Sequence, residues 1–221
     1  MACGSLYIVA TPIGNLDDIT VRAVDTLRAV DIIACEDTRR TSILTSKYGI
    51  SKPLVSFYSH NQLSRTGQLL KSLEAGKNVA LVSDAGTPGI SDPGYVIIKA
   101  AISGNIPVIP VPGPSALISA LIVSGKPTHK FVFEGFLSNK QSQRRKRLRE
   151  LKDDERTIIL YESPHRIVKL LEDIVHEMGD REIVCVRELT KKFEEIKREK
   201  AADIAAFYQK NTAKGEFVVI L

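Results

Sequence analysis

The stretch VALVSDAGTPGISDPG (79–94) passes from a short apolar run into a loop rich in glycine, proline and aspartate. The run is apolar at every position, which is typical of a strand that is covered on both faces. Similar runs recur along the chain, and helical patterns lie between most of them. The runs that we interpret as strands are LYIVA (6–10), DIIAC (31–35), LVSF (54–57), VALV (79–82), VIPV (108–111), FVFE (131–134), TIILY (157–161), IVCV (183–186) and FVVIL (217–221).

The alternation of strands and helices predicts an α/β fold with mostly parallel central sheets covered by helices. The clearest helical pattern lies at 164–178, where one face is apolar and Ser163 is placed to cap the N-terminus. The segment 114–123 is apolar nearly all round, which predicts a buried helix.

The chain has 221 residues, a length that suits one large domain or two small ones. Glycine, proline and lysine interrupt the hydrophobic pattern at SGKPTHK (124–130), which we interpret as a linker. We therefore expect an N-terminal lobe over 1–123 and a C-terminal lobe over 131–221. The pattern at 189–210 fits either one long helix or a short strand followed by a helix.

The composition is that of a globular protein, with 43% hydrophobic and 26% charged residues, which excludes a disordered, collagen-like or coiled-coil chain. Cys3, Cys35 and Cys185 are widely spaced and predict neither disulfides nor a zinc site. No apolar run has the length of a membrane span. These features predict a soluble cytoplasmic protein without a bound metal. The net charge of +5 is modest, so arguments about partners depend on where the charge lies.

Three loops rich in glycine and proline follow predicted strands, at 10–18, 83–94 and 111–116. Such loops could be tight turns alone, but the carboxyl ends of parallel strands are where open α/β sheets bind ligands. Gly86 and Gly89 would let the backbone approach a ligand closely. The absence of GxGxxG and GxxxxGK[ST] motifs argues against a dinucleotide site and a P-loop. We therefore predict a small-molecule site of another kind.

Polar motifs also follow predicted strands, namely ACEDTRR (34–40), YSHN (58–61) and YESPHR (161–166). These side chains could cap helices or form surface ion pairs. Their position at the same edge favours contact with a substrate. The members of this group are Glu36, Asp37, Arg39, Arg40, His60, Asn61, Glu162, His165 and Arg166.

The segment NKQSQRRKRLRELK (139–152) holds seven lysine or arginine residues and one glutamate. A run of like charge is usually a solvated helix face, and Leu148 and Leu151 can pack one side of it on the protein. The density of charge nevertheless favours contact with a polyanion such as RNA, since arginine matches phosphate geometry. The residues predicted to make this contact are Arg144, Arg145, Lys146, Arg147 and Arg149.

Eight blocks resemble, in this order and over essentially the whole chain, one family of enzymes. They are LYIVATPIGNLDDIT, ACEDTRR, VSDAGTPGISDPG, VPGPSA, FEGFL, YESPHR, RELTKKFEE and KGEFV. The family is that of the small-subunit ribosomal RNA cytidine 2′-O-methyltransferases, within the tetrapyrrole methylase superfamily. The resemblance implies two α/β lobes, S-adenosylmethionine in the cleft between them, a homodimer, a strand at 193–198 and a helix at 201–210.

The resemblance also implies roles for particular residues. The ribose 2′-oxygen would attack the methyl group of the donor, which requires alignment and an acceptor for the hydroxyl proton. The candidate acceptors are Glu36, Asp37, His60 and Glu162. RNA would be held by Arg39, Arg40, Arg166 and the basic segment. The donor would contact Ile13, Asp84, Ala85, Gly86, Thr87, Pro88, Gly89, Ile90, Ser91, Ser115, Ala116, Tyr161 and the chain around Phe217.

Two other functions remain open at this point. A member of the same superfamily could methylate a tetrapyrrole or a protein side chain, although the basic segment argues against a macrocyclic substrate. The chain could also be a non-catalytic RNA-binding module. The loop at 83–94 argues against that function, because a plain RNA binder has no use for a small-molecule site.

Overall fold

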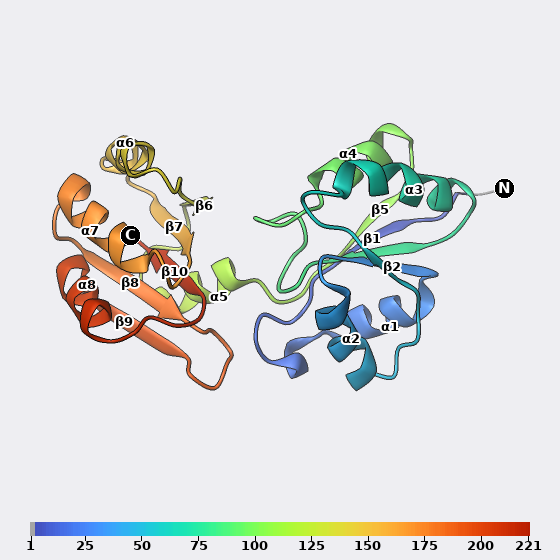
Figure 1. The fold of residues 1–221 in the computed structure, drawn as a ribbon, viewed down its shortest axis with the longest axis horizontal. Helices are drawn as coiled ribbons and strands as arrows, with labels where there is room; N and C mark the ends of the chain where they lie inside the picture. Colours follow the sequence, from blue (N-terminus) through green and yellow to red (C-terminus); the bar gives the residue numbers. More distant parts are fainter. Residues whose placement is uncertain (1–2) are drawn as a thin grey trace. The chain divides into compact units, whose positions relative to one another are not determined.

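The computed structural model describes residues 3–221 and divides into two compact units, which meet between Ser115 and Ala116. The helix α5 (Ala116–Ser124) belongs to the second unit, because Leu117 and Leu121 pack on the second sheet. The division thus precedes both the expected end of the first lobe at 123 and the segment 124–130. Figure 1 shows the two units, which are described separately below.

The first unit contains a five-stranded sheet in the order β3-β2-β4-β1-β5, and every strand pair is parallel. This confirms the first five predicted strands and their parallel arrangement. The strands are β1 (Leu6–Val9), β2 (Ile32–Cys35), β3 (Leu54–Ser56), β4 (Val79–Val82) and β5 (Val108–Val111). The helices are η1 (Leu16–Asp18), α1 (Val21–Ala29), α2 (Thr38–Lys47), α3 (Gln62–Glu74) and α4 (Tyr95–Ser103).

Helices cover both faces of this sheet, with α1 and α2 on one side and α3 and α4 on the other (Figure 1). Successive residues of β4 point to opposite faces, as the period of a strand requires. Val79 and Leu81 therefore pack with the side chains of α3 and α4, whereas Ala80 and Val82 pack with those of α1. Burial on both faces explains why β4 is apolar throughout.

The second unit contains a five-stranded sheet in the order β6-β7-β10-β8-β9. β6 and β7 are parallel, and the other three pairs are antiparallel, so the expectation of a mostly parallel sheet is wrong here. The strands are β6 (Phe131–Phe136), β7 (Thr157–Glu162), β8 (Glu182–Arg187), β9 (Glu195–Lys200) and β10 (Phe217–Ile220). The helices besides α5 are α6 (Gln141–Leu151), α7 (Ile167–Met178) and α8 (Ala201–Lys210). β9 and α8 confirm the strand and helix that the resemblance implied.

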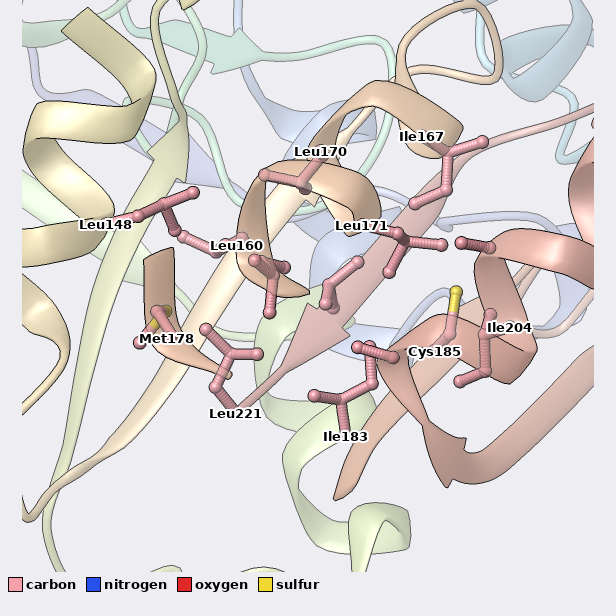
Figure 2. Packing of buried hydrophobic residues seen from close by; sticks show 14 of the residues in the cluster. Leu148, Leu160, Ile167, Leu170, Leu171, Met178, Ile183, Cys185, Ile204 and Leu221 are labelled. Carbon is pink, nitrogen blue, oxygen red and sulfur yellow. The ribbon is translucent and has the colours of Figure 1, made fainter. Parts of the chain in front are cut away.

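The core of the second unit lies between the sheet and the helices α6, α7 and α8 (Figure 2). Leu170 and Leu171 of α7 pack there against Leu160 of β7 and Ile204 of α8, and all four side chains are almost completely buried. The apolar face predicted for the 164–178 helix is thus the face that builds this core.

Two predictions about the helices of this unit are wrong in detail. α5 buries one face on the sheet, but Ile118 and Ile122 on its other face are exposed, so the helix is half-buried. α7 begins at Ile167, and among the described residues no side chain caps its N-terminus. The Ser163 carbonyl instead accepts hydrogen bonds from the backbone N–H groups of Arg166 and Ile167, forming a turn before the helix.

Candidate active site

Three loops of the first unit are joined by hydrogen bonds at the carboxyl edge of its sheet. The N–H of Thr11 donates to the carbonyl of Gly86 at 2.9 Å, and the N–H of Gly86 donates back at 2.9 Å. The Thr11 hydroxyl also donates to the carbonyl of Ser83 at 3.1 Å. The Thr87 hydroxyl donates to the carbonyl of Pro114 at 3.4 Å, which attaches the third loop. The loops predicted to lie at one edge therefore do meet there.

The loop 83–94 has an unusual backbone conformation. Gly86 has a φ of +79°, and a Cβ atom at this position would lie 3.4 Å from Cγ2 of the buried Ile13. Ser91 has a φ of +62°, a left-handed conformation that costs a residue with a side chain about 1–2 kcal/mol. Such conformations persist where surrounding contacts hold them, and they are frequent at ligand sites.

The residues expected to contact a methyl donor differ in accessibility. Gly89, Ile90 and Ser91 form the exposed part of the loop. Asp84, Ala85 and Thr87 are half-buried, as are Ser115 and Ala116, which lie on the two sides of the division between the units. Gly86, Pro88 and Ile13 are buried and form the base of the loop. The structure thus joins the loops of the first unit that hold the residues predicted to contact the donor.

Asp37 and Asp84 link the polar motif after β2 to this loop. The backbone N–H of Asp37 donates to Oδ1 of Asp84 at 3.0 Å, and Nη1 of Arg40 lies 3.5 Å from Oδ2 of Asp84. The Asp37 carboxylate caps α2 by accepting from the N–H of Arg39 at 2.8 Å. Hydrogen bonds from the Arg39 guanidinium and backbone hold the pKa of Asp37 at about 2. A carboxylate held in this way is a weak proton acceptor.

Glu36 is half-buried beside the same loop. Burial raises the pKa of its carboxyl above the ordinary value, and the negative charge of Asp84 raises it further. A raised pKa makes a carboxylate a better proton acceptor near neutral pH. His60 is exposed after β3, in edge contact with the ring of Tyr58 at 6.3 Å. Of the candidates in the first unit, Glu36 therefore has the most suitable environment.

Glu162 lies at the end of β7 in the second unit and is 2% exposed. Its Oε1 accepts from the N–H of Ser163 at 2.8 Å, and its Oε2 lies 3.1 Å from Nη2 of Arg166. Burial is the main cause that raises its pKa. Arg166 in turn donates to the carbonyl of Leu137 at 2.6 Å. Because Glu162 is covered, this geometry favours a role in positioning Arg166 over direct contact with a substrate.

Tyr161 and Phe217, on neighbouring strands, have different surroundings. Tyr161 is half-buried and makes edge contacts with the rings of Phe133 at 4.9 Å and Phe136 at 5.7 Å. Phe217 is 2% exposed and packs edge-on against Tyr208 at 5.2 Å. The side chain of Phe217 is thus part of the core, and a ligand in this region would meet the neighbouring backbone.

Arg144 of α6 is buried, so the prediction that it contacts RNA is wrong. Its Nε donates to Oδ2 of Asp173 at 2.7 Å, and Asp173 on α7 is 1% exposed. Arg145 donates to the other oxygen of Asp173 at 2.6 Å. Burial by itself would raise the pKa of Asp173, but the hydrogen bonds from Arg145 and Arg144 outweigh it and lower the pKa.

The remaining charges of α6 are partly offset by carboxylates of other elements. Arg149 donates to Glu177 of α7 at 2.8 Å, and Arg147 donates to Glu134 of β6 at 2.7 Å. Lys146 is exposed. These partners could not be recognised from the basic segment itself, because most of them lie on α7, further along the chain. One feature of the sequence did indicate a partner for the basic segment. Asp173 and Glu177 are four residues apart within the predicted amphipathic helix, so their carboxylates lie on one face.

Comparison with known proteins identifies the class of enzyme. Residues 5–205 match the family of tetrapyrrole (corrin/porphyrin) methylases. The fold is similar to that of diphthine synthase, with a TM-score of 0.77 and 16% identity over 99% of this chain and 90% of that one. It is also similar to a cobalt precorrin-4 methyltransferase of cobalamin biosynthesis, with a TM-score of 0.74 and 19% identity over 98% and 94% of the two chains. The chain belongs to the tetrapyrrole methylase family of S-adenosylmethionine-dependent methyltransferases.

Two relatives define the branch of the family more narrowly. A protein of Synechocystis, named ribosomal RNA small subunit methyltransferase I, is 52% identical over 99% of this chain and 78% of its own length. A protein of Thermotoga maritima with the same name is 50% identical over 99% of this chain and 98% of its own length. These similarities confirm the family that the sequence motifs indicated.

Proposed function

We propose that this protein transfers the methyl group of S-adenosylmethionine to the ribose 2′-hydroxyl of a cytidine in small-subunit ribosomal RNA. The names of the relatives support the substrate class. The observation that supports the chemistry most directly is the junction of three loops around Thr11 and Gly86 at the carboxyl edge of the first sheet. That edge is where α/β enzymes bind small molecules.

The residues of the first unit suit this methyl donor. Ile13 and Ile90 offer apolar contacts for a purine ring, and Gly86 allows the backbone to approach it. The carboxylate of Asp84 offers a partner for a positive charge. When bound, the donor supplies a methyl group on a positively charged sulfur, so the protein needs only to align the acceptor and remove its proton.

In the proposed mechanism, Glu36 accepts the proton of the 2′-hydroxyl, and His60 is the second candidate. Arg39 is exposed in the first turn of α2 and would hold a phosphate of the RNA. Asp37 would act indirectly, because it caps α2 and orients Arg39. The strong dependence of such a reaction on alignment explains why the residues around the loop are held by so many hydrogen bonds.

The proposed activity is tested by mapping ribose methylation in small-subunit ribosomal RNA from cells with and without the protein. Mass spectrometry of RNA fragments should show one cytidine that loses a single methyl group when the protein is absent. An identical methylation pattern in both RNAs would contradict the proposed function.

The resemblance also leads us to propose that the protein acts as a homodimer in the cytoplasm. Within residues 3–221, no helix is both long and apolar enough to cross a membrane. In the same described part of the chain, no group of three or more His, Cys, Asp or Glu side chains is arranged to hold a metal ion.

Replacing Gly86 by valine is expected to weaken donor binding at least about tenfold, because a side chain at this left-handed position, with its Cβ atom 3.4 Å from Cγ2 of Ile13, forces the backbone of the loop to shift. Gly49→Val is a matched control. Gly49 also has a left-handed φ, of +61°, but a Cβ atom there would meet nothing within 4 Å. Both variants should lose some stability, and calorimetry should show weaker donor binding in Gly86→Val alone. Equal donor affinity in the two variants would exclude this loop from the donor site.

Lys146 provides a test of the RNA contact proposed for α6, since it is exposed. Lys146→Glu should weaken RNA binding and reduce the slope of log affinity against log salt by up to about one unit, as expected for the loss of one phosphate contact. The reversal of exposed Lys71 on α3 serves as a control for net charge. Identical salt slopes for the two variants would mean that α6 does not contact RNA at this position.

A further inference from the structure

β6 ends in an irregular pairing with β7. Phe133 lies opposite Ile159, and the next pair along the ladder is Gly135 with Leu160. Glu134 is thus an extra residue without a partner in β7, which defines a β-bulge. Gly135 follows it with a φ of +61°, a left-handed conformation that glycine adopts without the steric cost of a Cβ atom.

The bulge decides which face of the sheet receives Phe136. With the bulge, Phe136 lies opposite Tyr161, and the two rings meet edge-on with centroids 5.7 Å apart. In an unbroken strand, Phe136 would lie opposite Glu162 and would point to the same face as Leu160, which packs in the core below α7. Gly135 takes the position opposite Leu160 instead, and it adds no side chain to that core.

Phe136 is 54% exposed in its new position, although its backbone is held firmly. Arg166 donates to the carbonyl of the next residue, Leu137, at 2.6 Å. Glu134, which the bulge displaces from the ladder, accepts from Arg147 at 2.7 Å. The ring is thus supported on one edge by Tyr161, and the residues on either side of it along the chain bind the guanidinium groups of Arg147 and Arg166. Bulges that re-aim a side chain in this way are frequent near functional sites.

We infer that Phe136 is a platform on which one base of the RNA substrate stacks, a role that rests on the proposed function. An exposed ring offers a face on which a base can stack, because every base has an apolar face and stacking on an aromatic side chain does not depend on its identity. Phenylalanine cannot form hydrogen bonds to a base edge. The platform therefore positions a nucleotide without identifying it.

The test compares Phe136→Leu with Phe136→Trp and with Phe131→Leu. Phe131 is a matched control, because it lies at the other end of β6 and is 38% exposed. The substrate is the small ribosomal subunit purified from cells that lack the protein. Phe136→Leu should lower kcat/KM for methyl transfer about fivefold or more, mainly through KM, as expected for the loss of one stacked base. Phe136→Trp should retain activity, and Phe131→Leu should match the wild type.

Two further measurements separate this role from others. Donor affinity, measured by calorimetry, should be the same in all four proteins, whereas a parallel loss in Phe136→Leu would place the ring against the donor and overturn the inference. Equal kcat/KM for Phe136→Leu and Phe131→Leu would also overturn it. If the wild type does not methylate the subunit, the proposed function fails. RNA affinity of the same variants, together with ultraviolet cross-linking of the peptide that contains Phe136, then decides whether the platform exists.

Discussion

Glu36→Gln is expected to lower the rate of methyl transfer by ~10²–10⁴ at saturating donor and RNA, while the affinity for the donor changes little. Glutamine has nearly the same size as glutamate, but its amide cannot accept the hydroxyl proton. The side chain lies beside Asp84 of the donor loop, so it is near the reacting atoms if the donor binds there. Single-turnover measurements of methyl transfer would show the loss directly.

The pH dependence of the reaction identifies the acceptor further. Burial and the charge of Asp84 raise the pKa of Glu36, and the group accepts a proton only when it is ionised. In the wild type, kcat/KM should therefore fall on the acidic side at a higher pH than an ordinary glutamate would give. Glu36→Gln should remove this limb of the profile.

Asp37→Asn is the matched control, because Asp37 has a pKa of about 2 and is ionised across the accessible range. This variant should keep the acidic limb while the N-terminus of α2 becomes less stable. If His60→Ala removes the limb and Glu36→Gln does not, His60 is the acceptor. Unchanged turnover in both would mean that alignment alone drives the reaction.

Continuous apolar runs predicted every strand of both sheets except β9, whose charged sequence EIKREK was predicted to form a strand only through the resemblance. The runs did not predict the direction of the strands in the second sheet. A buried strand has the same apolar sequence whether its neighbouring strands are parallel or antiparallel to it. One of the three antiparallel pairs comes from the loop between β8 and β9, which reverses the chain through left-handed conformations at Glu188 and Thr190, with φ values of +52° and +64°. The other two are made by β10, which lies between β7 and β8. Neither residue is a typical turn former, so the hairpin has no signal in the sequence.

The candidate site was also predicted from the sequence only in part. Gly86 and its neighbours could be recognised from the sequence as part of a ligand site, because a glycine-rich loop directly after a buried strand is typical of such a site. The basic segment was misinterpreted, because the charge that offsets its arginines comes from Asp173 and Glu177 on another helix. Within the segment itself, Glu150 is the one carboxylate, and it pairs with Arg147. The pairing that offsets the other arginines depends on how α6 and α7 pack.

Asp173→Ala should therefore lower the free energy of unfolding by about 3–5 kcal/mol, since it leaves the charge of Arg144 buried without a carboxylate to offset it. Urea denaturation of the full chain would measure this loss. Arg149→Ala is the control. The Arg149 side chain is 56% exposed, and Glu177 keeps its contacts with Arg145 and His176, so the loss should cost less than about 1 kcal/mol. The double variant Arg144→Met with Asp173→Leu should regain most of the stability, because it removes both charges from the interior.

The stability of these three variants decides how the arginines of α6 can be studied. If Asp173→Ala is much less stable than the double variant, Arg144 holds α6 on α7, and reversal of its charge would unfold the second unit before RNA binding could be measured. If Asp173→Ala instead matches Arg149→Ala, the buried pair contributes little, and Arg144 and Arg145 are free to turn toward a polyanion. The geometry favours the first outcome, because one carboxylate that is 1% exposed accepts from both arginines. A phosphate would have to displace Asp173 from its buried position to reach Arg144, whereas Lys146 is accessible without any rearrangement.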